Sequence, residues 1–313
     1  MISFIIIGKN EGERLRKCLD SIIIVAQQDK LKSWEIIYVD SKSTDSSIAI
    51  AKGFPRVNVY LITGACNAAI ARNIGAKEAN GEILYFIDGD MEILPGFLPK
   101  VTKDEVTLEY EFISGRFMDI VYDSNWIYLY SSSRMKNTQC VYESVVGGLF
   151  VISKQLWKQI GGMDTRQKRS QDYDLGLRLT SHGTPLLRYP DVIARHHMVE
   201  YSARSEYVKY VKYTALLLRK HITNKHYLPV FVGQHYTSLV LIISLILAFA
   251  VKWWMIGLYI LSLCYKIISA TRRQGKNTIH KHYIFNLMKR DICIWFYFIF
   301  CFDKQVTEEY TKV

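Results

Sequence analysis

The sequence predicts an α/β protein with a doubly wound sheet, followed by a C-terminal hairpin of two transmembrane helices. Short apolar runs alternate with helical patterns over residues 4–88, as expected of a parallel sheet covered by helices. Polar clusters follow the ends of three of these runs, and a long stretch without charged residues begins at residue 227. The 313 residues suit one domain of about 200 residues with an appendage.

The first predicted strand is residues 4–7, an apolar run rich in β-branched residues that ends at Gly8 and is typical of a buried parallel strand. A helix is expected over residues 15–23, because apolar residues recur there at spacings of three and four. The second strand, residues 35–39, ends at Asp40.

Serine, threonine and aspartate at residues 43–46 supply caps for a second helix, which continues through residues 48–51. The third strand is the apolar run at residues 57–62. An alanine-rich helix is expected over residues 65–79, and the fourth strand over residues 83–87.

Polar residues follow three of these strands directly. They are residues 8–11, Asp40 and the Asp88-Gly89-Asp90 motif. Because the carboxyl ends of parallel strands meet at one edge of a sheet, where open α/β sheets bind ligands, we expect these side chains to form one site.

The C-terminal third is predicted to enter a membrane. Residues 227–251 contain no Asp, Glu, Lys or Arg, and about 20 apolar residues suffice for a spanning helix. Residues 253–270 form a second candidate, with Lys266 near its end. The positive-inside rule places the following basic loop in the cytoplasm, together with the α/β domain. The alternative is a pair of buried helices in a soluble domain.

These patterns predict a multi-pass protein of the cell (inner) membrane with a cytoplasmic α/β domain. Residues 292–302 are too short to span a membrane and are expected to lie at its interface. The predicted parts are the α/β domain at 1–200, basic amphipathic interfacial helices at 201–230, the transmembrane hairpin at 231–270, and a cytoplasmic basic loop, interfacial helix and tail at 271–313.

The net charge of +11 suits an anionic partner. Basic residues concentrate at 204–225 and 272–290, beside the apolar helices, which favours membrane lipids over nucleic acid. The six cysteines show neither zinc-site spacing nor a disulfide pattern, which indicates free thiols in a reducing compartment. Residues 1–7 lack the basic start of a signal peptide, as expected for a cytosolic N-terminal domain.

The Asp88-Gly89-Asp90 motif has the composition of a cation site. Carboxylate oxygens are preferred ligands of Mg²⁺ and Mn²⁺, which usually complete their shell with water and substrate phosphates. The glycine lets a diphosphate approach the backbone closely. A solvated turn is the alternative for such a motif taken alone.

Several further stretches occur in a fixed order over residues 1–200, and together they resemble the family 2 glycosyltransferases. The resemblance implies a GT-A-like fold with a mixed sheet, and a catalytic domain at residues 1–200. The stretches are residues 3–15, 38–46, 71–76, 86–92, 147–148, 160–164 and 171–178.

The resemblance also implies roles for individual residues. Asp172 would be the catalytic base that takes the acceptor proton, since the family inverts the anomeric carbon. Asp88 and Asp90 would hold Mn²⁺ or Mg²⁺, and a late histidine joins the metal in some GT-A enzymes, for which His197 is favoured narrowly over His196. The expected donor-binding residues are Gly8, Asn10, Glu11, Asp40, Arg72, Asp88 and Asp90.

Structural roles stay open for four of these residues. Asp172 could cap a helix or pair with Arg178, Asp40 could stabilise a turn, Arg72 could serve packing, and His197 could be a core or site-lining histidine. Two positions depart from the family pattern: Gln171 stands where a glutamate is usual, and Lys9 where an aromatic residue is common.

The expected reaction is the inverting transfer of one hexosyl-type sugar from a nucleoside-diphosphate sugar to a hydroxyl of a lipid-linked or other glycan acceptor. The Gln-x-x-Arg-Trp motif of processive synthases is absent, which favours addition of one sugar at a time. A nucleotidyltransferase is disfavoured, because only Gly8-Lys9 and Gly12 stand in place of its glycine-rich loop. The remaining alternative is an inactive membrane scaffold that retains the fold.

Overall fold

The computed structural model describes residues 1–103, 107–133, 136–142, 146–200, 210–274 and 283–313. It divides into two compact units, a sheet unit of Met1–Ser202 and Lys304–Val313 and a helical unit of Ala203–Asp303. Two predicted features lie partly outside the described residues. Residues 201–209 of the predicted interfacial helices at 201–230 lie outside the described residues, and so do residues 275–282 of the predicted basic loop.

The four strands predicted from the N-terminal half form the parallel centre of the sheet. β1 pairs with β2 on one side and with β4 on the other, and β2 pairs with β3. These strands are β1 (Ile2–Gly8), β2 (Trp34–Asp40), β3 (Val57–Ile62) and β4 (Ile83–Asp88). The helices between them are α1 (Glu13–Gln28), α2 (Ser47–Lys52) and α3 (Ala68–Glu78).

The rest of the sheet makes it mixed, which confirms the predicted fold class. β11 runs antiparallel to β4, β8 runs antiparallel to β11, and β12 runs parallel to β8. The longer strands are β8 (Phe112–Tyr122), β11 (Phe150–Ser153) and β12 (Leu187–Val199). The shorter strands are β5 (Met91–Ile93), β6 (Thr102–Lys103), β7 (Thr107–Leu108), β9 (Tyr128–Ser132) and β10 (Val141–Tyr142). The helices of this half are α4 (Leu98–Val101), α5 (Lys154–Ile160) and α6 (Gln171–Ser181).

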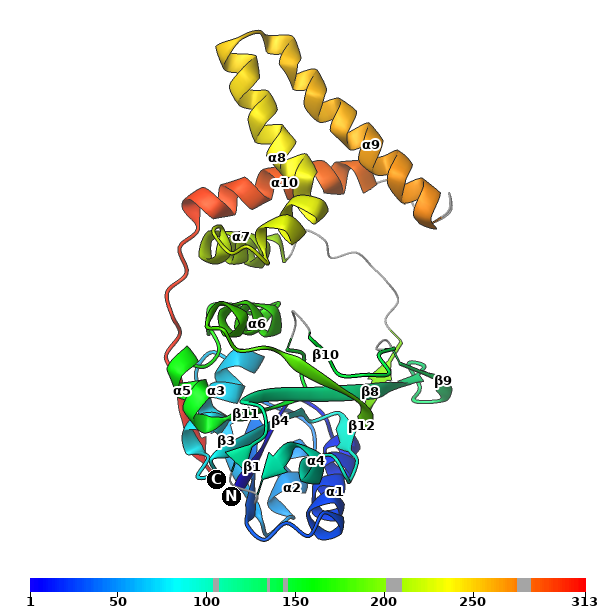
Figure 1. Cartoon of the computed structure of the whole chain (residues 1–313), viewed down its shortest axis with the longest axis vertical. Coiled ribbons are helices and arrows are strands. Elements are labelled where there is room, and N and C mark those ends of the chain that lie inside the picture. Colours follow the sequence, from blue (N-terminus) through cyan, green and yellow to red (C-terminus); the bar gives the residue numbers. More distant parts are fainter. Residues whose placement is uncertain (104–106, 134–135, 143–145, 201–209, 275–282) are drawn as a thin grey trace. The chain divides into compact units, whose positions relative to one another are not determined.

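Two apolar cores cover the two faces of the sheet, because alternate residues of a buried strand point to opposite sides. Phe4 and Ile6 of β1 belong to the core with α1, whereas Ile5 belongs to the core with α3, α5 and α6. Figure 1 shows these two helical layers around the sheet. A Cβ on Gly75 of α3 would lie 2.2 Å from Ile5 Cγ2, so a glycine allows this helix to pack closely on β1.

The last residues of the chain return to the sheet unit, although the sequence division assigned them to the segment 271–313. We call Lys304–Val313 the C-terminal strap. Its strand β13 (Tyr310–Lys312) pairs antiparallel with the outer side of β3. The Tyr310 hydroxyl donates to Glu78 Oε1 at 2.6 Å, and Lys77 lies over the tyrosine ring. The strap thus covers what would otherwise be an exposed sheet edge.

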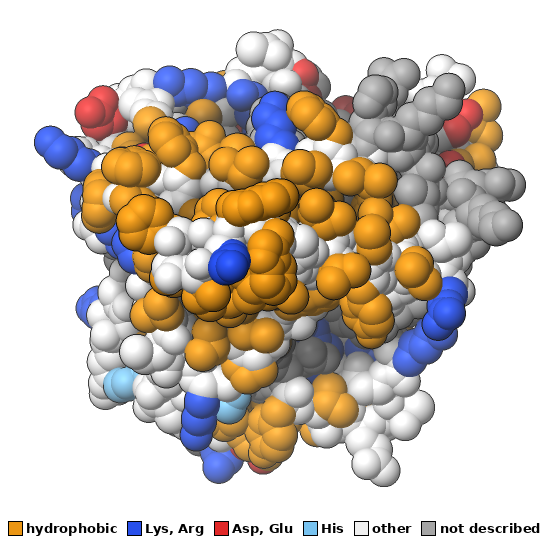
Figure 2. Space-filling view, turned by 90° about the horizontal axis from the view of Figure 1, so that it is seen from above, with side chains coloured by type: hydrophobic (Ala, Val, Ile, Leu, Met, Phe, Trp, Pro, Cys, Tyr) orange, Lys and Arg blue, Asp and Glu red, His pale blue; other side chains and the backbone are white. Residues whose placement is uncertain are grey.

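The helical unit contains two helices that are long and apolar enough to cross a membrane, at Leu228–Ala250 and Trp253–Arg272. Their apolar windows are only 28% and 11% buried, so most of these side chains face outward, unlike the core helices of a soluble domain. Figure 2 shows the apolar side chains gathered on this surface. The elements of the unit are α7 (Val211–His221), α8 (Leu228–Ala250), the 3₁₀ helix η1 (Trp253–Ile256), α9 (Gly257–Gln274) and α10 (Tyr283–Phe300).

A buried ion pair joins three helices of this unit. Arg290 of α10 donates to Asp291 Oδ1 (2.6 Å) and to Thr237 Oγ1 of α8 (3.0 Å). The Tyr259 hydroxyl of α9 donates to Asp291 Oδ2 at 3.2 Å. Because an unpaired buried charge is costly, these bonds fix α10 against the other two helices.

Candidate functional site

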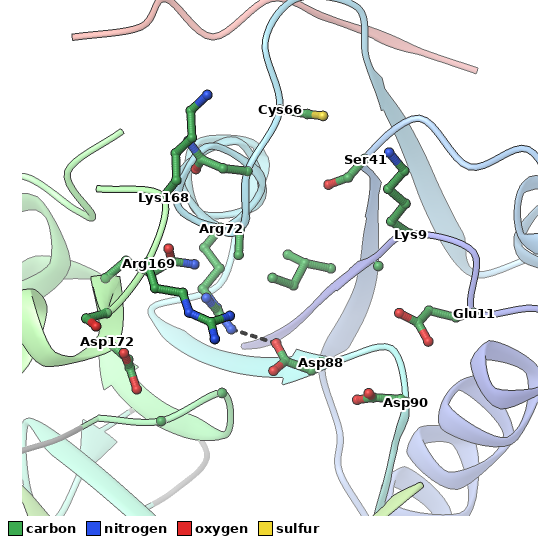
Figure 3. Close-up of a pocket in the computed structure, with 18 residues that line it drawn as sticks. Lys9, Glu11, Ser41, Cys66, Arg72, Asp88, Asp90, Lys168, Arg169 and Asp172 are labelled. Atoms are coloured by element: carbon green, nitrogen blue, oxygen red, sulfur yellow. Dashed lines mark hydrogen bonds and ion pairs between the residues drawn. The ribbon is translucent and has the colours of Figure 1, made fainter. Parts of the chain in front are cut away.

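A cavity of about 580 Å³ opens at the carboxyl ends of β1 and β4, where the sequence predicts a site. Figure 3 shows Asp172 across this cavity from Asp90 and Glu11. The predicted residues that line it are Gly8, Glu11, Arg72, Asp88, Asp90 and Asp172. The other lining residues are Ile7, Lys9, Ser41, Cys66, Asn67, Ala68, Gly147, Gly148, Lys168, Arg169, Ser170 and Gln171.

The register of the parallel strands brings the acidic motif to this cavity. Ile7 of β1 lies opposite Asp88 of β4, and Gly89 donates its N–H to the Ile7 carbonyl at 2.8 Å. The chain therefore turns directly from β4 into β5, and Asp90 lines the cavity beside Asp88.

Gly148, just before β11, lies against Asp88. A Cβ on Gly148 would be 2.1 Å from Asp88 Oδ2 and 2.8 Å from Asp88 Cγ. This position therefore admits no side chain while Asp88 keeps its place.

Gly148→Ala is expected to lower any activity that depends on Asp88 by about a hundredfold, because a displacement of about 1 Å in a side chain of a site can have that effect. The folded state should survive, since overpacking costs about 1–3 kcal/mol. The check is the rate of that activity together with the melting temperature. Gly233→Ala is the matched control, because a Cβ there meets no atom within 4 Å. An active Gly148→Ala enzyme would contradict the requirement for Asp88 at this spot.

Arg72 contacts the acidic motif from α3. Its Nη2 donates to Asp88 Oδ1 at 2.6 Å, and only 5% of its side chain is exposed. Burial raises the pKa of Asp88, the guanidinium opposes this, and the charge of Asp90 adds to the increase. Arg72 is thus buried against Asp88, which suits a packing role, and it also lines the cavity, which suits donor binding.

A cluster of charges surrounds Asp90. Arg14 Nη2 pairs with Glu11 Oε2 at 2.7 Å, and Arg14 Nη1 lies 4.0 Å from Asp90 Oδ2. His196 Nε2 lies 3.4 Å from Asp90 Oδ2, and its Nδ1 lies 2.7 Å from Asp119 Oδ1. Burial lowers the pKa of His196, but its hydrogen bonds and charge contacts with Asp90 and Asp119 outweigh it and raise that pKa to about 9.

Burial and the charge of Asp90 raise the pKa of Glu11 from 4.5 to about 7. Its ionisation therefore opposes folding, and the cost corresponds to about 3 kcal/mol. A raised folded-state pKa means that stability is greatest below the unfolded pKa, falls as pH rises toward 7, and is then constant.

Glu11→Gln is accordingly expected to raise the melting temperature at pH 8 in the absence of divalent cations. The gain should shrink between pH 7 and pH 4.5 and vanish below, because the wild-type carboxyl is then neutral too. Thermal unfolding of both proteins across this pH range is the measurement. A gain that does not depend on pH would show that the ionisation of Glu11 is not its cause.

The donor set around Asp90 fits a hard divalent cation. Asp90 Oδ1 is buried and has no hydrogen-bond partner in the described part of the chain. Such an oxygen beside a second carboxylate suits Mg²⁺ or Mn²⁺. Among the described residues no group of three or more His, Cys, Asp or Glu side chains forms a ready metal shell. A cation here would therefore take further ligands from water and substrate phosphates.

The two histidines of β12 point to different partners. His196 faces Asp90, whereas His197 Nε2 lies 2.9 Å from Glu92 and its Nδ1 is 2.9 Å from the Tyr122 hydroxyl. Burial lowers the pKa of His197, so its imidazole is the less readily protonated of the two. The prediction favoured His197, but the side chain that contacts the Asp90 carboxylate is that of His196, whereas His197 contacts Asp90 only through its backbone N–H, which donates to the Asp90 carbonyl at 2.9 Å.

Helix α6 presents Asp172 to the cavity in its first turn, where the helix dipole favours a carboxylate. Arg178 pairs with Asp174 at 3.0 Å, and Asp174 is fully buried. The salt bridge with Arg178 that the sequence allowed for Asp172 is therefore made by Asp174, and Asp172 lines the cavity.

Gln171 departs from the family pattern for a visible reason. In the amide orientation that suits its surroundings, its nitrogen donates to the carbonyls of Gln167 and Lys168 at 2.9 and 3.2 Å. An ionised glutamate could not donate to either carbonyl.

Two predicted donor-binding residues stabilise loops beside the cavity and do not line it. Asp40 is fully buried and accepts hydrogen bonds from the Tyr38 hydroxyl (2.8 Å) and the Ser43 N–H (2.7 Å). Asn10 Oδ1 accepts from the Thr44 N–H at 2.8 Å. Both therefore shape the loops after β1 and β2, where Lys9 and Ser41 line the cavity.

Sequence reasoning missed most of the positive side of the cavity. Lys9, Lys168 and Arg169 line it together with Arg72, and of these three the sequence marks only Lys9, as a departure from the family pattern. The only signal for Lys168 and Arg169 is position, since the pair shortly precedes Asp172. Asp119, which contacts His196, comes from the middle of β8 and carries no sequence signal.

Residues 3–161 match the model of a protein family described as Glycosyl transferase family 2. The amylovoran biosynthesis glycosyltransferase AmsB of Erwinia amylovora is 24% identical over 242 residues, which is 71% of this chain and 79% of that protein.

Two solved structures share the fold at low sequence identity. S. aureus TarS 1-349 in complex with UDP-GlcNAc has a TM-score of 0.57 at 14% identity, covering 94% of this chain and 89% of that chain. GalNAc-T7 with UDP, GalNAc and Mn²⁺ has a TM-score of 0.54 at 17% identity, covering 70% of this chain and 47% of that chain. These likenesses confirm the GT-A-like fold that the sequence implies.

Proposed function

This chain belongs to glycosyl transferase family 2 and is a glycosyltransferase, and from this we propose that it moves one sugar at a time from a nucleoside-diphosphate sugar to an acceptor hydroxyl, with inversion. Uridine diphosphate is the proposed nucleotide, since both structural neighbours carry it or its sugar conjugate. The observation that carries the proposal is one cavity lined by basic side chains, by Asp88 and Asp90, and by Asp172.

The basic side chains suit the diphosphate. Lys9 approaches the cavity from the loop after β1, Arg72 from α3, and Lys168 and Arg169 from the loop before α6. Ammonium and guanidinium groups bind phosphate oxygens strongly. When bound at Asp88 and Asp90, Mn²⁺ or Mg²⁺ would neutralise the charge that develops on the leaving diphosphate.

Asp172 is the proposed general base. It lines the cavity from the start of α6 and is free of the ion pair that Asp174 makes with Arg178. An ionised carboxylate facing the sugar can accept the proton of the attacking hydroxyl, as inversion requires on the side opposite the leaving group. His196 and Arg14 would hold Asp90 in place from the other side.

We propose that the acceptor is a lipid-linked glycan and that the helical unit anchors the enzyme in the inner membrane, with the sheet unit in the cytoplasm. Two helices of sufficient length, with apolar side chains mostly facing outward, support the anchor. The named role of AmsB in amylovoran biosynthesis supports a glycan acceptor. Recovery of the protein in the supernatant after alkaline carbonate extraction of membranes would contradict the anchor.

The proposal is tested by thermal unfolding of the full chain with each nucleoside diphosphate and its sugar conjugates, with and without Mn²⁺ or Mg²⁺. We expect UDP and one UDP-sugar to raise the melting temperature, and the metal to enlarge that rise, because ligands stabilise only the folded state. A response confined to nucleoside triphosphates, with pyrophosphate released, would point to nucleotidyl transfer instead.

A further inference from the structure

A second cavity, of about 440 Å³, adjoins at Glu11 the cavity of about 580 Å³ described above, which we call the donor cavity. The two cavities share only this residue among their linings. Its volume falls within the range of small-molecule sites, about 300–1,000 Å³. Its lining residues are Asn10, Glu11, Glu13, Arg14, Lys17, Asp45, Tyr122, Trp126 and His197.

One wall of this cavity is aromatic. The rings of Tyr122 and Trp126 are 5.5 Å apart, and the Tyr122 hydroxyl is 2.9 Å from His197 Nδ1. Trp126 is 47% exposed, so much of its ring remains accessible to a ligand.

The turn that carries Trp126 is built to hold it. Trp126 has a φ of 63°, a left-handed conformation that is unusual for a bulky side chain. Asp123 Oδ1 accepts hydrogen bonds from the N–H groups of Asn125 and Ile127, both at 2.8 Å. The Trp126 N–H donates to the Asp123 carbonyl at 3.1 Å. Strain of this kind, held in place by a fixed turn, is a feature of ligand-binding positions.

Arg14 joins the aromatic wall to the acidic motif. Its guanidinium lies 4.8 Å from the centre of the Trp126 ring, and it also pairs with Glu11. It donates to the carbonyl oxygens of Asn10 and His197 at 3.3 and 3.5 Å. The wall and the rim are therefore one connected structure that reaches the edge of the donor cavity.

The charges of the rim argue for a neutral ligand. Glu11, Glu13 and Asp45 are acidic, and Arg14 and Lys17 are basic, so this cavity has no excess of positive charge for a phosphate. Closely spaced carboxylates, cations and an amide can donate to and accept from many hydroxyl groups. An aromatic face bordered by such groups matches a sugar ring, which has apolar C–H faces and a hydroxyl edge.

We propose that this second cavity binds a neutral hexopyranose ring, which packs on the part of the Trp126 ring that Arg14 leaves exposed and bonds to the charged rim. That the bound sugar is a unit of the acceptor glycan rests on the proposed function, whereas the binding itself does not. The cavity then holds the acceptor chain at a point other than the reacting hydroxyl, since Asp172 lines the donor cavity and not this one.

The test uses the full chain labelled with 5-fluorotryptophan in a detergent without sugar, such as lauryldimethylamine oxide. The ¹⁹F resonance of Trp126 is assigned by its loss in Trp126→Phe, and the other five tryptophans report whether that variant folds. The probes are the methyl glycosides of glucose, galactose, mannose, N-acetylglucosamine and N-acetylgalactosamine. Saturating UDP and Mn²⁺ occupy the donor cavity throughout.

At least one glycoside is expected to shift the Trp126 resonance saturably and to leave Trp253 and Trp254 unmoved. These two, at 80% and 58% exposure, are the matched exposed controls. Tyr122→Ala should weaken the sugar response about tenfold. Tyr142→Ala, which removes a 74% exposed tyrosine outside the cavity, should not change it.

The proposal is overturned if no glycoside moves the Trp126 resonance at its solubility limit, or if all exposed tryptophans respond alike. It is also overturned if inorganic pyrophosphate or sugar-free phosphatidylglycerol vesicles move that resonance in place of the sugars. If UDP fails to bind while the sugar response persists, the proposed function fails and the sugar site stands.

Discussion

Asp90→Asn is expected to lower sugar transfer by about three orders of magnitude and to abolish the stabilisation of the UDP complex by Mn²⁺. Asparagine keeps the shape of the side chain but removes the negative charge that a divalent cation needs. The loss of several kcal/mol of charge stabilisation on the leaving diphosphate accounts for the rate. The measurements are the turnover number and thermal unfolding with UDP, each with and without Mn²⁺.

The structure provides reasons for so large an effect at this position. Asp90 Oδ1 is buried and has no hydrogen-bond partner among the described residues, and Oδ2 is approached by His196 and Arg14. The control is Asp191→Asn, which removes a carboxylate that pairs with Lys100 at the surface and does not line the donor cavity. An Asp90→Asn enzyme that keeps both its rate and its Mn²⁺ response would place the metal elsewhere.

Asp172→Asn is expected to lower the turnover number by about 10²–10⁴, the usual contribution of a general base. Binding of UDP and Mn²⁺ should be unchanged, because the acidic motif and the basic side chains stay in place. The melting temperature should fall only slightly, through the lost interaction with the helix dipole, since the carboxylate of Asp172 is not the partner of Arg178. Steady-state kinetics with thermal unfolding in the presence of UDP and Mn²⁺ tests these three expectations together.

Asp174→Asn is the informative comparison, two residues along the same helix. It removes the buried charge that pairs with Arg178, so it should lower the melting temperature. If Asp172→Asn lost UDP binding or much of its stability as well as rate, Asp172 would have a structural role and the base would be another group.

The parallel half of the fold could be predicted from the sequence because its signals are local. The apolar runs of β1 and β4 are buried, and the spacing of apolar residues in α1 follows one helical face. The convergence of Gly8, Asp88 and Asp90 then follows from parallel pairing alone. Asp172 reaches the same cavity from α6. The family resemblance indicated this residue, whereas the local pattern of apolar and polar residues did not.

The choice between His196 and His197 could not be made from sequence. Side chains alternate along a strand, so one residue of register decides which histidine faces Asp90. The pairing of β12 with β8 contains register shifts between Tyr189 and Val192 and between Val192 and Ala194. Such shifts change the alternation and depend on a partner strand far away in the sequence.

Asp40 shows a second limit. Its position at the end of a strand correctly places Asp40 at the carboxyl edge of the sheet, where the site lies. A short polar side chain at such a position can, however, form hydrogen bonds within its own loop. The Tyr38 hydroxyl and the Ser43 N–H occupy its two oxygens. Whether such a residue turns to the loop or to the cavity is decided by neighbours that no pattern identifies.

The C-terminal strap makes the helical unit an insertion between the body of the sheet and its last strand. The strap holds the two loops that flank the donor cavity. In the first loop, the N–H groups of Thr63 and Gly64 donate to the backbone carbonyl of Glu309. In the second loop, Thr165 Oγ1 accepts from the Val306 N–H at 3.0 Å. Cutting the chain after Ser202 to obtain a water-soluble enzyme would therefore also delete that strand and release both loops. A soluble version that keeps the site has to rejoin Ser202 to Lys304 through a linker.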